Sequence, residues 1–118
     1  MIVAGIGCRS GCGAAEIVAL VRAAGQPDLL AAPAFKAHEA GLREAAATLG
    51  LALALVPDAA LAAAQPRCLT RSAAAMRATG HASIAEAAAL VHGGSLLGPR
   101  IASANATCAL AMAPGAAP

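Results

Sequence analysis

The chain has 118 residues, a formal net charge of +2 and 59% hydrophobic residues, many of them alanine. This length fits one domain, which we place at residues 1–112, followed by a flexible tail at 113–118. A single aromatic residue, Phe35, and scattered cationic residues exclude the base-stacking and basic-stripe modules that bind nucleic acids. No apolar stretch reaches the roughly 20 residues that span a membrane, and no signal peptide is evident. We therefore expect a cytoplasmic protein with reduced cysteines and no membrane partner.

Strand-like and helix-like segments alternate through most of the chain. Short apolar runs predict buried strands at 1–7, 28–35 and 51–56. Apolar residues at helical spacing predict two helices that stop at glycines. The first follows the opening turn, has Ile17, Leu20, Val21 and Ala24 on one face and stops at Gly25; the second covers about residues 39–49 and stops at Gly50.

Shorter elements are predicted after residue 57. Asp58 should cap a short helix, and Ser72 should cap a helical turn that ends at Gly80. The polar stretch 65–72 between them predicts a solvated loop. A second possibility is that this loop, with Arg71 and Ser72, acts as a lid over a ligand.

Residues 83–86, "SIAE", match a capping box in which Ser83 and Glu86 bond each other's backbone amides. Two short strands, at 95–99 and 106–112, should pair antiparallel as a C-terminal hairpin. The whole pattern predicts an α/β protein, a three-layer α/β/α sandwich with a mixed, mostly parallel sheet. Ligands in such folds bind beyond the carboxyl ends of the strands, where the first turn lies.

That first turn belongs to "GIGCRSGCG" at 5–13 and allows several interpretations. Cys8 and Cys12 are one residue too far apart for a C-x-x-C redox pair, and no second pair completes a metal site, so we expect no metal. A dithiol role stays open beside the simpler interpretation of small packing cysteines. The spacing G-x-G-x-x-x-G is one residue longer than the dinucleotide fingerprint, and no G-K-[ST] follows as in a P-loop.

A glycine-rich turn between a strand and a helix presents backbone N–H groups and the positive end of the helix dipole. Arg9 and Ser10 add a guanidinium and a hydroxyl at the same place. The turn therefore either binds an anion, a carboxylate or a phosphate, or is a purely structural corner.

Four blocks of the sequence resemble, in order, the family formed by CobE and the C-terminal domain of CbiG, proteins of cobalamin biosynthesis. They are "GIGCRSGCG" at 5–13, "FKAHEAGL" at 35–42, "GHASIAEAAAL" at 80–90 and "ATCALAMA" at 106–113. Because the chain starts at the first block, it resembles the free-standing CobE type. It departs from the family at Arg100, where a lysine is usual; the charge is kept, but a transferable amine proton is not.

The resemblance implies that the protein binds a corrinoid or precorrin intermediate, a modified tetrapyrrole with acetate and propionate side chains. The glycine-rich turn would hold one carboxylate, and Lys36 and Arg100 would reach others. The ligand-binding residues implied are Gly5, Gly7, Cys8, Arg9, Ser10, Gly11, Lys36, Glu39, Ser83, Glu86 and Arg100.

Two of these residues, Glu39 and Glu86, each allow a structural interpretation beside the ligand-binding one. Glu39 either orients Lys36 or favours the first turn of a helix, and Glu86 either lines a pocket or belongs to the capping box. The sequence shows no Ser-His-Asp order, no pair of carboxylates that would act as acid and base, and no histidine with a visible partner. We therefore assign no catalytic residue and expect no cofactor. Other enzymes of the cobalamin pathway are candidate partners.

Two alternative functions remain open. One is an enzyme, or an enzyme's partner, that acts on a corrinoid lactone, because CbiG is associated with opening such a ring. The other is a Rossmann-like module that binds a phosphate or a nucleotide.

Overall fold

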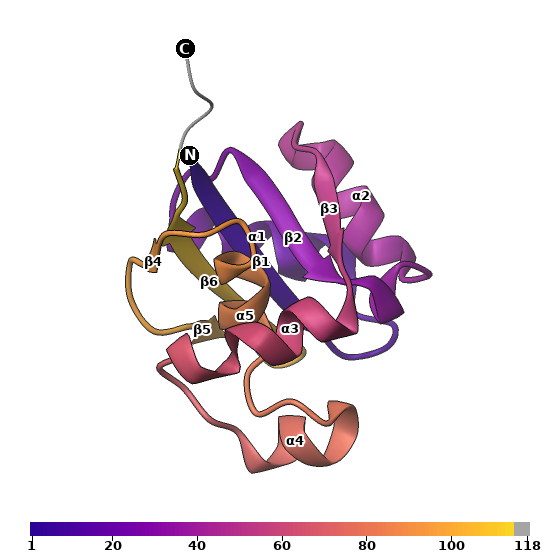
Figure 1. Cartoon of the computed structure of the whole chain (residues 1–118). Coiled ribbons are helices and arrows are strands. Elements are labelled where there is room, and N and C mark those ends of the chain that lie inside the picture. Colours follow the sequence, from indigo (N-terminus) through magenta and orange to yellow (C-terminus); the bar gives the residue numbers. More distant parts are fainter. Residues whose placement is uncertain (115–118) are drawn as a thin grey trace.

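The protein forms three layers, a central β-sheet with helices on both faces, in a computed structural model that describes residues 1–114 (Figure 1). The helices are α1 (Ala14–Ala24), α2 (Ala40–Leu49), α3 (Asp58–Ala64), α4 (Ala73–Thr79) and α5 (Ala85–Leu90), with 3₁₀ turns η1 (Ala34–Lys36) and η2 (Gln65–Arg67). In Figure 1, α3 and α5 lie in front of the sheet, α1 and α2 lie behind it, and α4 stands apart beyond one end. The predicted α/β/α sandwich is confirmed.

The described residues form one six-stranded sheet in the order β3-β2-β1-β6-β4, with β5 also paired to β6. Its strands are β1 (Ile2–Cys8), β2 (Leu29–Pro33), β3 (Leu53–Val56), β4 (Ser95–Leu96), β5 (Ile101–Ala102) and β6 (Ala106–Met112). The first three strands are mutually parallel, whereas β6 is antiparallel to β1, β4 and β5. Five strands therefore run in one direction and β6 runs in the other, so the sheet is mixed and mostly parallel as predicted.

The predicted strands are close to the observed ones but differ at their ends. The run predicted at 28–35 stops at Pro33, because the next three residues turn into η1, and the run at 51–56 begins only at Leu53. The C-terminal hairpin is present as β4 and β6. Between them the chain adds β5, whose two residues are too few for a periodic pattern.

One predicted helix cap is confirmed and one is wrong. Ser72 caps α4, since its hydroxyl accepts a hydrogen bond from the Ala75 amide at 3.1 Å. Asp58 does not cap α3: Pro57 is the N-cap, and the Asp58 carboxylate lies 2.7 Å from His81 Nε2. Local spacing could not show this partner, which is 23 residues away in the chain.

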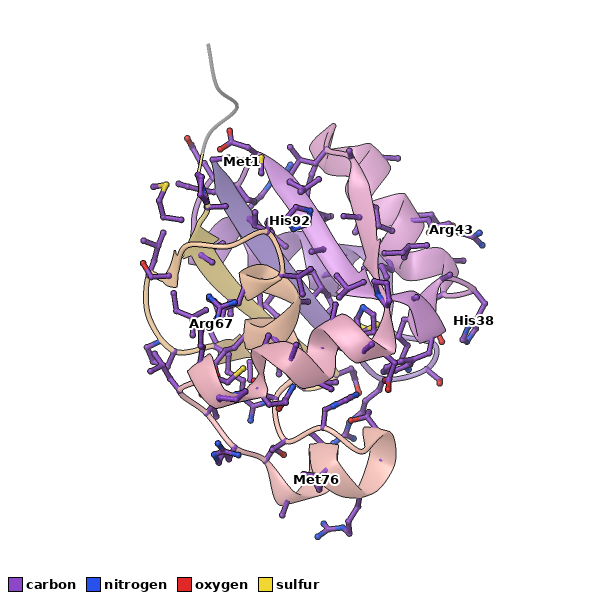
Figure 2. All side chains as sticks on the ribbon, viewed as in Figure 1. Met1, His38, Arg43, Arg67, Met76 and His92 are labelled. Carbon is purple, nitrogen blue, oxygen red and sulfur yellow. The ribbon has the colours of Figure 1, made fainter. Side chains whose placement is uncertain are left out.

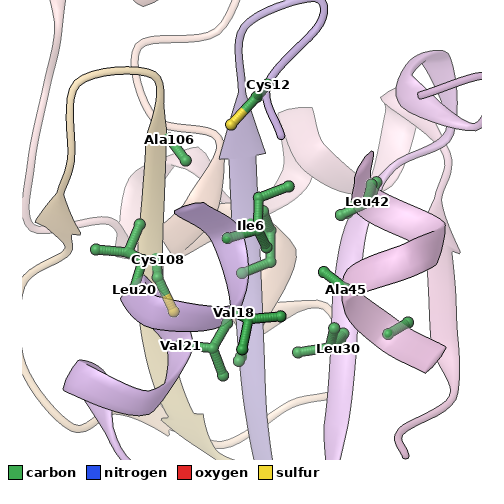
Figure 3. Packing of buried hydrophobic residues seen from close by; sticks show 14 residues of the cluster. Ile6, Cys12, Val18, Leu20, Val21, Leu30, Leu42, Ala45, Ala106 and Cys108 are labelled. Atoms are coloured by element: carbon green, nitrogen blue, oxygen red, sulfur yellow. The ribbon is translucent and has the colours of Figure 1, made fainter. Parts of the chain in front are cut away.

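The two faces of the sheet bury different kinds of side chain. Branched residues fill the face covered by α1 and α2, including Ile6, Val21, Leu30 and Leu42 (Figure 3). On the other face every residue of α5 is buried, and most are alanine. Small side chains let this helix lie directly on the sheet, so an alanine-rich chain can still bury a core.

The two ends of the described chain are held together beside the sheet. The Met1 amino group donates to the Ala113 carbonyl at 3.1 Å, and the Ala113 amide donates to the Met1 carbonyl at 2.8 Å. Ala113, the first residue of the predicted tail, is thus buried and continues the β1–β6 ladder. The remainder of the tail prediction, at 115–118, lies outside the described residues. None of the described helices is both long and apolar enough to cross a membrane.

Candidate functional site

A pocket of about 500 Å³ lies where β1 and β2 end and β6 begins, which is the ligand-binding edge expected for this fold. We call it the strand-end pocket. α4 forms one of its walls, and Figure 1 shows this helix beyond the carboxyl ends of the parallel strands. Its lining residues are Gly7, Cys8, Arg9, Pro33, Phe35, Lys36, Ser72, Ala74, Ala75, Ala78, Thr79, Ile84, Arg100, Ser103, Ala104, Asn105, Ala106 and Thr107.

Three cationic side chains line this pocket, each from a different segment. Arg9 follows β1, Lys36 ends η1 after β2, and Arg100 precedes β5. No aspartate or glutamate of the described residues joins them in the lining. Arg9 is exposed and Lys36 and Arg100 are half-buried, and cations gathered in a lining without acidic residues attract an anionic ligand.

Cys8 brings a thiol to the same wall. Burial raises the pKa of this thiol, and the charge of Lys36 offsets only part of the effect. A thiol with a raised pKa is protonated at neutral pH and is a poor nucleophile. All four cysteines are free thiols, and no three histidine, cysteine, aspartate or glutamate side chains gather as a metal site within residues 1–114.

The backbone of the glycine-rich turn is already bonded to the protein. The Arg9 amide donates to the Asn105 carbonyl at 2.9 Å, the Cys12 amide to the Arg9 carbonyl at 3.1 Å and the Gly11 amide to Glu39 Oε1 at 2.9 Å. Ser10 and Gly11 do not line the pocket. The turn therefore places Arg9 in the pocket lining, whereas these three amides, two of which belong to the expected ligand-binding residues Arg9 and Gly11, hold the corner in shape.

Glu39 lies at the start of α2, but its carboxylate bonds a segment that is distant in the sequence. It is the N-cap of α2 but makes no capping bond, and its carboxylate instead accepts from the Gly11 amide across 28 residues of chain. His38 Nε2 lies 3.2 Å from the other carboxylate oxygen. The hydrogen bond from Gly11 is the main reason that the pKa of Glu39 is lowered; the charges of His38 and Lys36 act in the same direction.

Glu86 is a fully buried carboxylate that organises the other side of the pocket. Its Oε1 accepts from the amides of Leu69 (3.0 Å) and Thr70 (2.7 Å) and from the Ser83 hydroxyl (3.2 Å). Its Oε2 accepts from the Thr70 hydroxyl (2.9 Å) and from the Arg100 amide (3.0 Å). Burial by itself raises the pKa of Glu86, but these hydrogen bonds outweigh it and hold the pKa below its usual value.

This arrangement replaces the predicted capping box. Ile84 is the N-cap of α5, and the Ser83 amide donates to Gln65 Oε1 at 3.1 Å rather than to Glu86. The "SIAE" spacing brings the Ser83 hydroxyl to Glu86, but the carboxylate turns towards loops that lie far away in the sequence. Neither residue lines the pocket.

Glu16 on α1 is a third anchoring carboxylate, which the sequence analysis missed. It accepts from the Asn105 amide at 2.7 Å, from Asn105 Nδ2 at 3.0 Å and from the Ser103 hydroxyl. Hydrogen bonds from Ser103 and then Asn105 lower the pKa of Glu16. The polar turn "SAN" at 103–105 was the available signal, but nothing local links it to a glutamate almost 90 residues earlier.

The structure brings five of the predicted site residues together in the pocket lining: Gly7, Cys8, Arg9, Lys36 and Arg100. Glu39, Ser83 and Glu86 support the backbone beside it. Gly5 lies under α5, away from the lining, where a Cβ would meet the Ala85 carbonyl oxygen at 1.9 Å. Ser72, which the sequence allowed as part of a lid, also lines the pocket, whereas Phe35 and the α4 residues after Ser72 were not predicted to do so.

His81 also has a partner that the sequence analysis did not find. It is buried, and its pairing with Asp58 joins the end of α4 to the start of α3. Neither residue lines the strand-end pocket, and the pair supports the loops around α4.

Comparison with known proteins identifies the family to which the chain belongs. The model of the family "Cobalamin synthesis G C-terminus" matches residues 2–111. The crystal structure of CobE, a protein from the cobalamin (vitamin B12) biosynthetic pathway, is similar with a TM-score of 0.87 at 38% identity, over 94% of this chain and 89% of that one. The cobalamin biosynthesis protein ChiG from Agrobacterium tumefaciens is similar with a TM-score of 0.76 at 41% identity, over 96% of this chain and 98% of that one. The search of curated proteins found no match. Since the family model covers nearly the whole chain and both structures share its fold at close to 40% identity, the chain belongs to the CobE and CbiG C-terminal family of cobalamin biosynthesis proteins.

Proposed function

We propose that the protein binds a carboxylate-rich corrinoid intermediate of cobalamin biosynthesis in the strand-end pocket. The observation that carries the proposal is the convergence of Arg9, Lys36 and Arg100 on one pocket whose described lining contains no acidic residue. A corrinoid intermediate carries acetate and propionate groups around its ring, so several cations spread over a wall suit it better than one. The planar guanidinium of arginine binds both oxygens of a carboxylate at once.

The carboxylates behind the pocket support binding because they fix the segments that carry the cations. Glu86 holds the Arg100 amide, Glu39 holds the turn after Arg9, and Glu16 holds Asn105. Segments that are held before the ligand arrives lose less conformational entropy when it binds. None of these three carboxylates is itself part of the lining.

The alternative functions receive less support from the site. A phosphate cradle needs free backbone amides at the glycine-rich turn, and three of these amides have protein acceptors. Lactone opening needs an activated nucleophile, whereas the thiol of the lining is protonated and no histidine or carboxylate among the described lining residues accompanies the hydroxyls of the lining and the Lys36 amine. Binding without catalysis is therefore the function that we propose.

A titration followed by visible absorbance tests the proposal. Cobyrinic acid, a corrin with free carboxylates, should bind, and cobinamide, which has the same ring with amidated side chains, should bind far more weakly. Arg9→Ala and Arg100→Ala should each weaken cobyrinic acid binding about tenfold or more, the loss expected for one charge-assisted hydrogen-bonded pair.

Arg43→Ala is the matched control, because Arg43 is exposed on α2 outside the pocket lining (Figure 2). It should leave the affinity unchanged. Equal affinities for cobyrinic acid and cobinamide, or an unaltered affinity in both pocket variants, would contradict the proposal.

A further inference from the structure

Phe35 stands out among the apolar side chains at the surface. It is the only phenylalanine, tyrosine or tryptophan in the chain, and it is 42% exposed. A folded protein usually buries such a side chain, because aromatic rings contribute strongly to a core. Of the large hydrophobic side chains that residues 1–114 leave exposed, Phe35 alone lines the strand-end pocket.

Phe35 lies beside both apolar and cationic residues of the pocket lining. Phe35 and Lys36 are neighbours in η1, at the carboxyl end of β2, and both line the pocket. Further apolar lining comes from Ile84 and from the face of α4 that carries Ala75 and Ala78. The pocket thus combines an apolar wall that includes one aromatic ring with cations that come from three segments.

A wall of this composition fits a ligand that is flat and apolar over its face and anionic at its rim. An aromatic ring prefers to pack against another conjugated face in an offset stack or edge-to-face. Flexible polycarboxylates offer the same charge but no such face, so the cations alone cannot distinguish them from a macrocycle.

We propose that Phe35 is the residue that makes the pocket selective for a flat conjugated macrocycle, by packing its ring against the face of the corrin. The inference rests on the proposed function and adds to it, because it assigns recognition of the ring to one side chain and recognition of the rim to the cations. The part of the Phe35 side chain that the folded protein leaves exposed is thereby assigned to ligand binding.

The first test compares variants of this position. Phe35→Ala should weaken cobyrinic acid binding about tenfold, and Phe35→Leu, which keeps apolar area without the π-system, should weaken it by a smaller factor. Both should remain folded under the binding conditions, which urea unfolding of each variant checks. Leu97→Ala is the control, because Leu97 is 53% exposed outside the pocket lining, and its affinity should not change.

The second test uses the fact that the chain contains a single phenylalanine. Growth with 4-fluorophenylalanine places one ¹⁹F label at residue 35, so one resonance reports on this ring alone. Saturation with cobyrinic acid should shift the resonance, whereas a linear hexaglutamate peptide, which is anionic but has no conjugated face, should leave it in place.

The outcomes separate the two proposals. If cobyrinic acid binds but the Phe35→Ala affinity is unchanged, or the ¹⁹F resonance does not move at saturation, the role of Phe35 is overturned and the proposed function stands. If the absorbance of cobyrinic acid does not change even with the unsubstituted protein, the proposed function fails and this inference fails with it.

Discussion

A missing side chain at Gly5 sets the distance between α5 and the sheet. A Cβ built there would lie 1.9 Å from the Ala85 carbonyl oxygen and 2.5 Å from the Ala89 amide nitrogen. Both are backbone atoms, so a rotamer change cannot relieve the contact and the whole helix must move. Gly5 was predicted to bind the ligand, but its role is to allow close packing.

Gly5→Ala should therefore reduce the free energy of unfolding by more than about 3 kcal/mol, beyond the usual cost of overpacking a core. Urea unfolding followed by circular dichroism measures this change. Gly98→Ala is the control, because a Cβ at residue 98 meets no atom within 4 Å, and it should change stability by less than about 0.5 kcal/mol. A Gly5→Ala variant as stable as the parent would show that α5 can shift without cost.

Glu86 is the residue on which the loops around the pocket depend most. Its two oxygens accept from five donors in four residues, and no buried side-chain polar atom in the described part of the chain lacks a partner. A neutral amide in its place would turn an N–H₂ group towards donors that need an acceptor.

Glu86→Gln should cost about 3 kcal/mol, the range for removing one partner of a buried hydrogen-bonded charge. It should also weaken corrinoid binding, because the Arg100 segment loses its anchor. Glu44→Gln, at an exposed position of α2, provides the comparison in the same unfolding measurement. If the two variants unfold alike, the five hydrogen bonds contribute nothing to the folded state.

At the scale of single elements, α4 differs from the other helices. None of its seven residues is buried, whereas every residue of α5 is. The excursion that carries α4 is closed at its base by the Ser72 amide, which donates to the Ala82 carbonyl at 2.8 Å, and by the His81–Asp58 pair. A helix with so little burial opens locally at a low free energy.

Hydrogen exchange should accordingly be much faster in α4 than in α5, and mass spectrometry of peptic peptides resolves the two segments. Ser72→Ala removes the N-cap bond to Ala75 and should speed exchange in α4 about fivefold, which corresponds to about 1 kcal/mol. Exchange in α5 should stay the same. Equal protection of the two helices would refute this account of α4.

The elements also show which predictions are within reach of sequence reasoning. Strands β1, β2 and β3 and the helices between them follow from short apolar runs, helical spacing and glycine stops, all of which act within a few residues. Arg9 was found because it lies in a turn between a predicted strand and a predicted helix, whereas Lys36 and Arg100 were implied by the family resemblance. The anchoring by Glu16, Glu39 and Glu86 could not be found, because each carboxylate meets donors from distant segments.

At the scale of the whole molecule, these three carboxylates link stability to pH. The pKa of each is lowered in the folded protein, so each binds a proton more readily when the chain is unfolded. Their contribution is fully present above the unfolded pKa, close to 4.5, and is lost as the pH falls through the lower folded values.

The free energy of unfolding should therefore fall steeply below about pH 4.5. Denaturant titrations between pH 7 and pH 3 measure the slope, and Glu16→Gln and Glu39→Gln should each make it shallower. Glu44→Gln should retain the slope of the parent. A parent slope that none of the anchoring variants changes would assign acid sensitivity to other groups.

The overall architecture was predictable because alternating elements and right-handed crossovers leave few arrangements for a parallel sheet. The strand order on the β6 side of the sheet was harder to predict from the sequence. β5 has two residues, and its pairing with β6 depends on a register between Ile101 and Cys108 that no local pattern marks.

The pairing of β6 with β1 has a consequence for synthesis. β6 is flanked by β1 on one side and by β4 and β5 on the other, yet it leaves the ribosome after all of them. Until it emerges, the β1 edge of the parallel strands is unpaired and neither β4 nor β5 has the strand that it pairs with, so folding as a cooperative unit must wait until translation has passed residue 112.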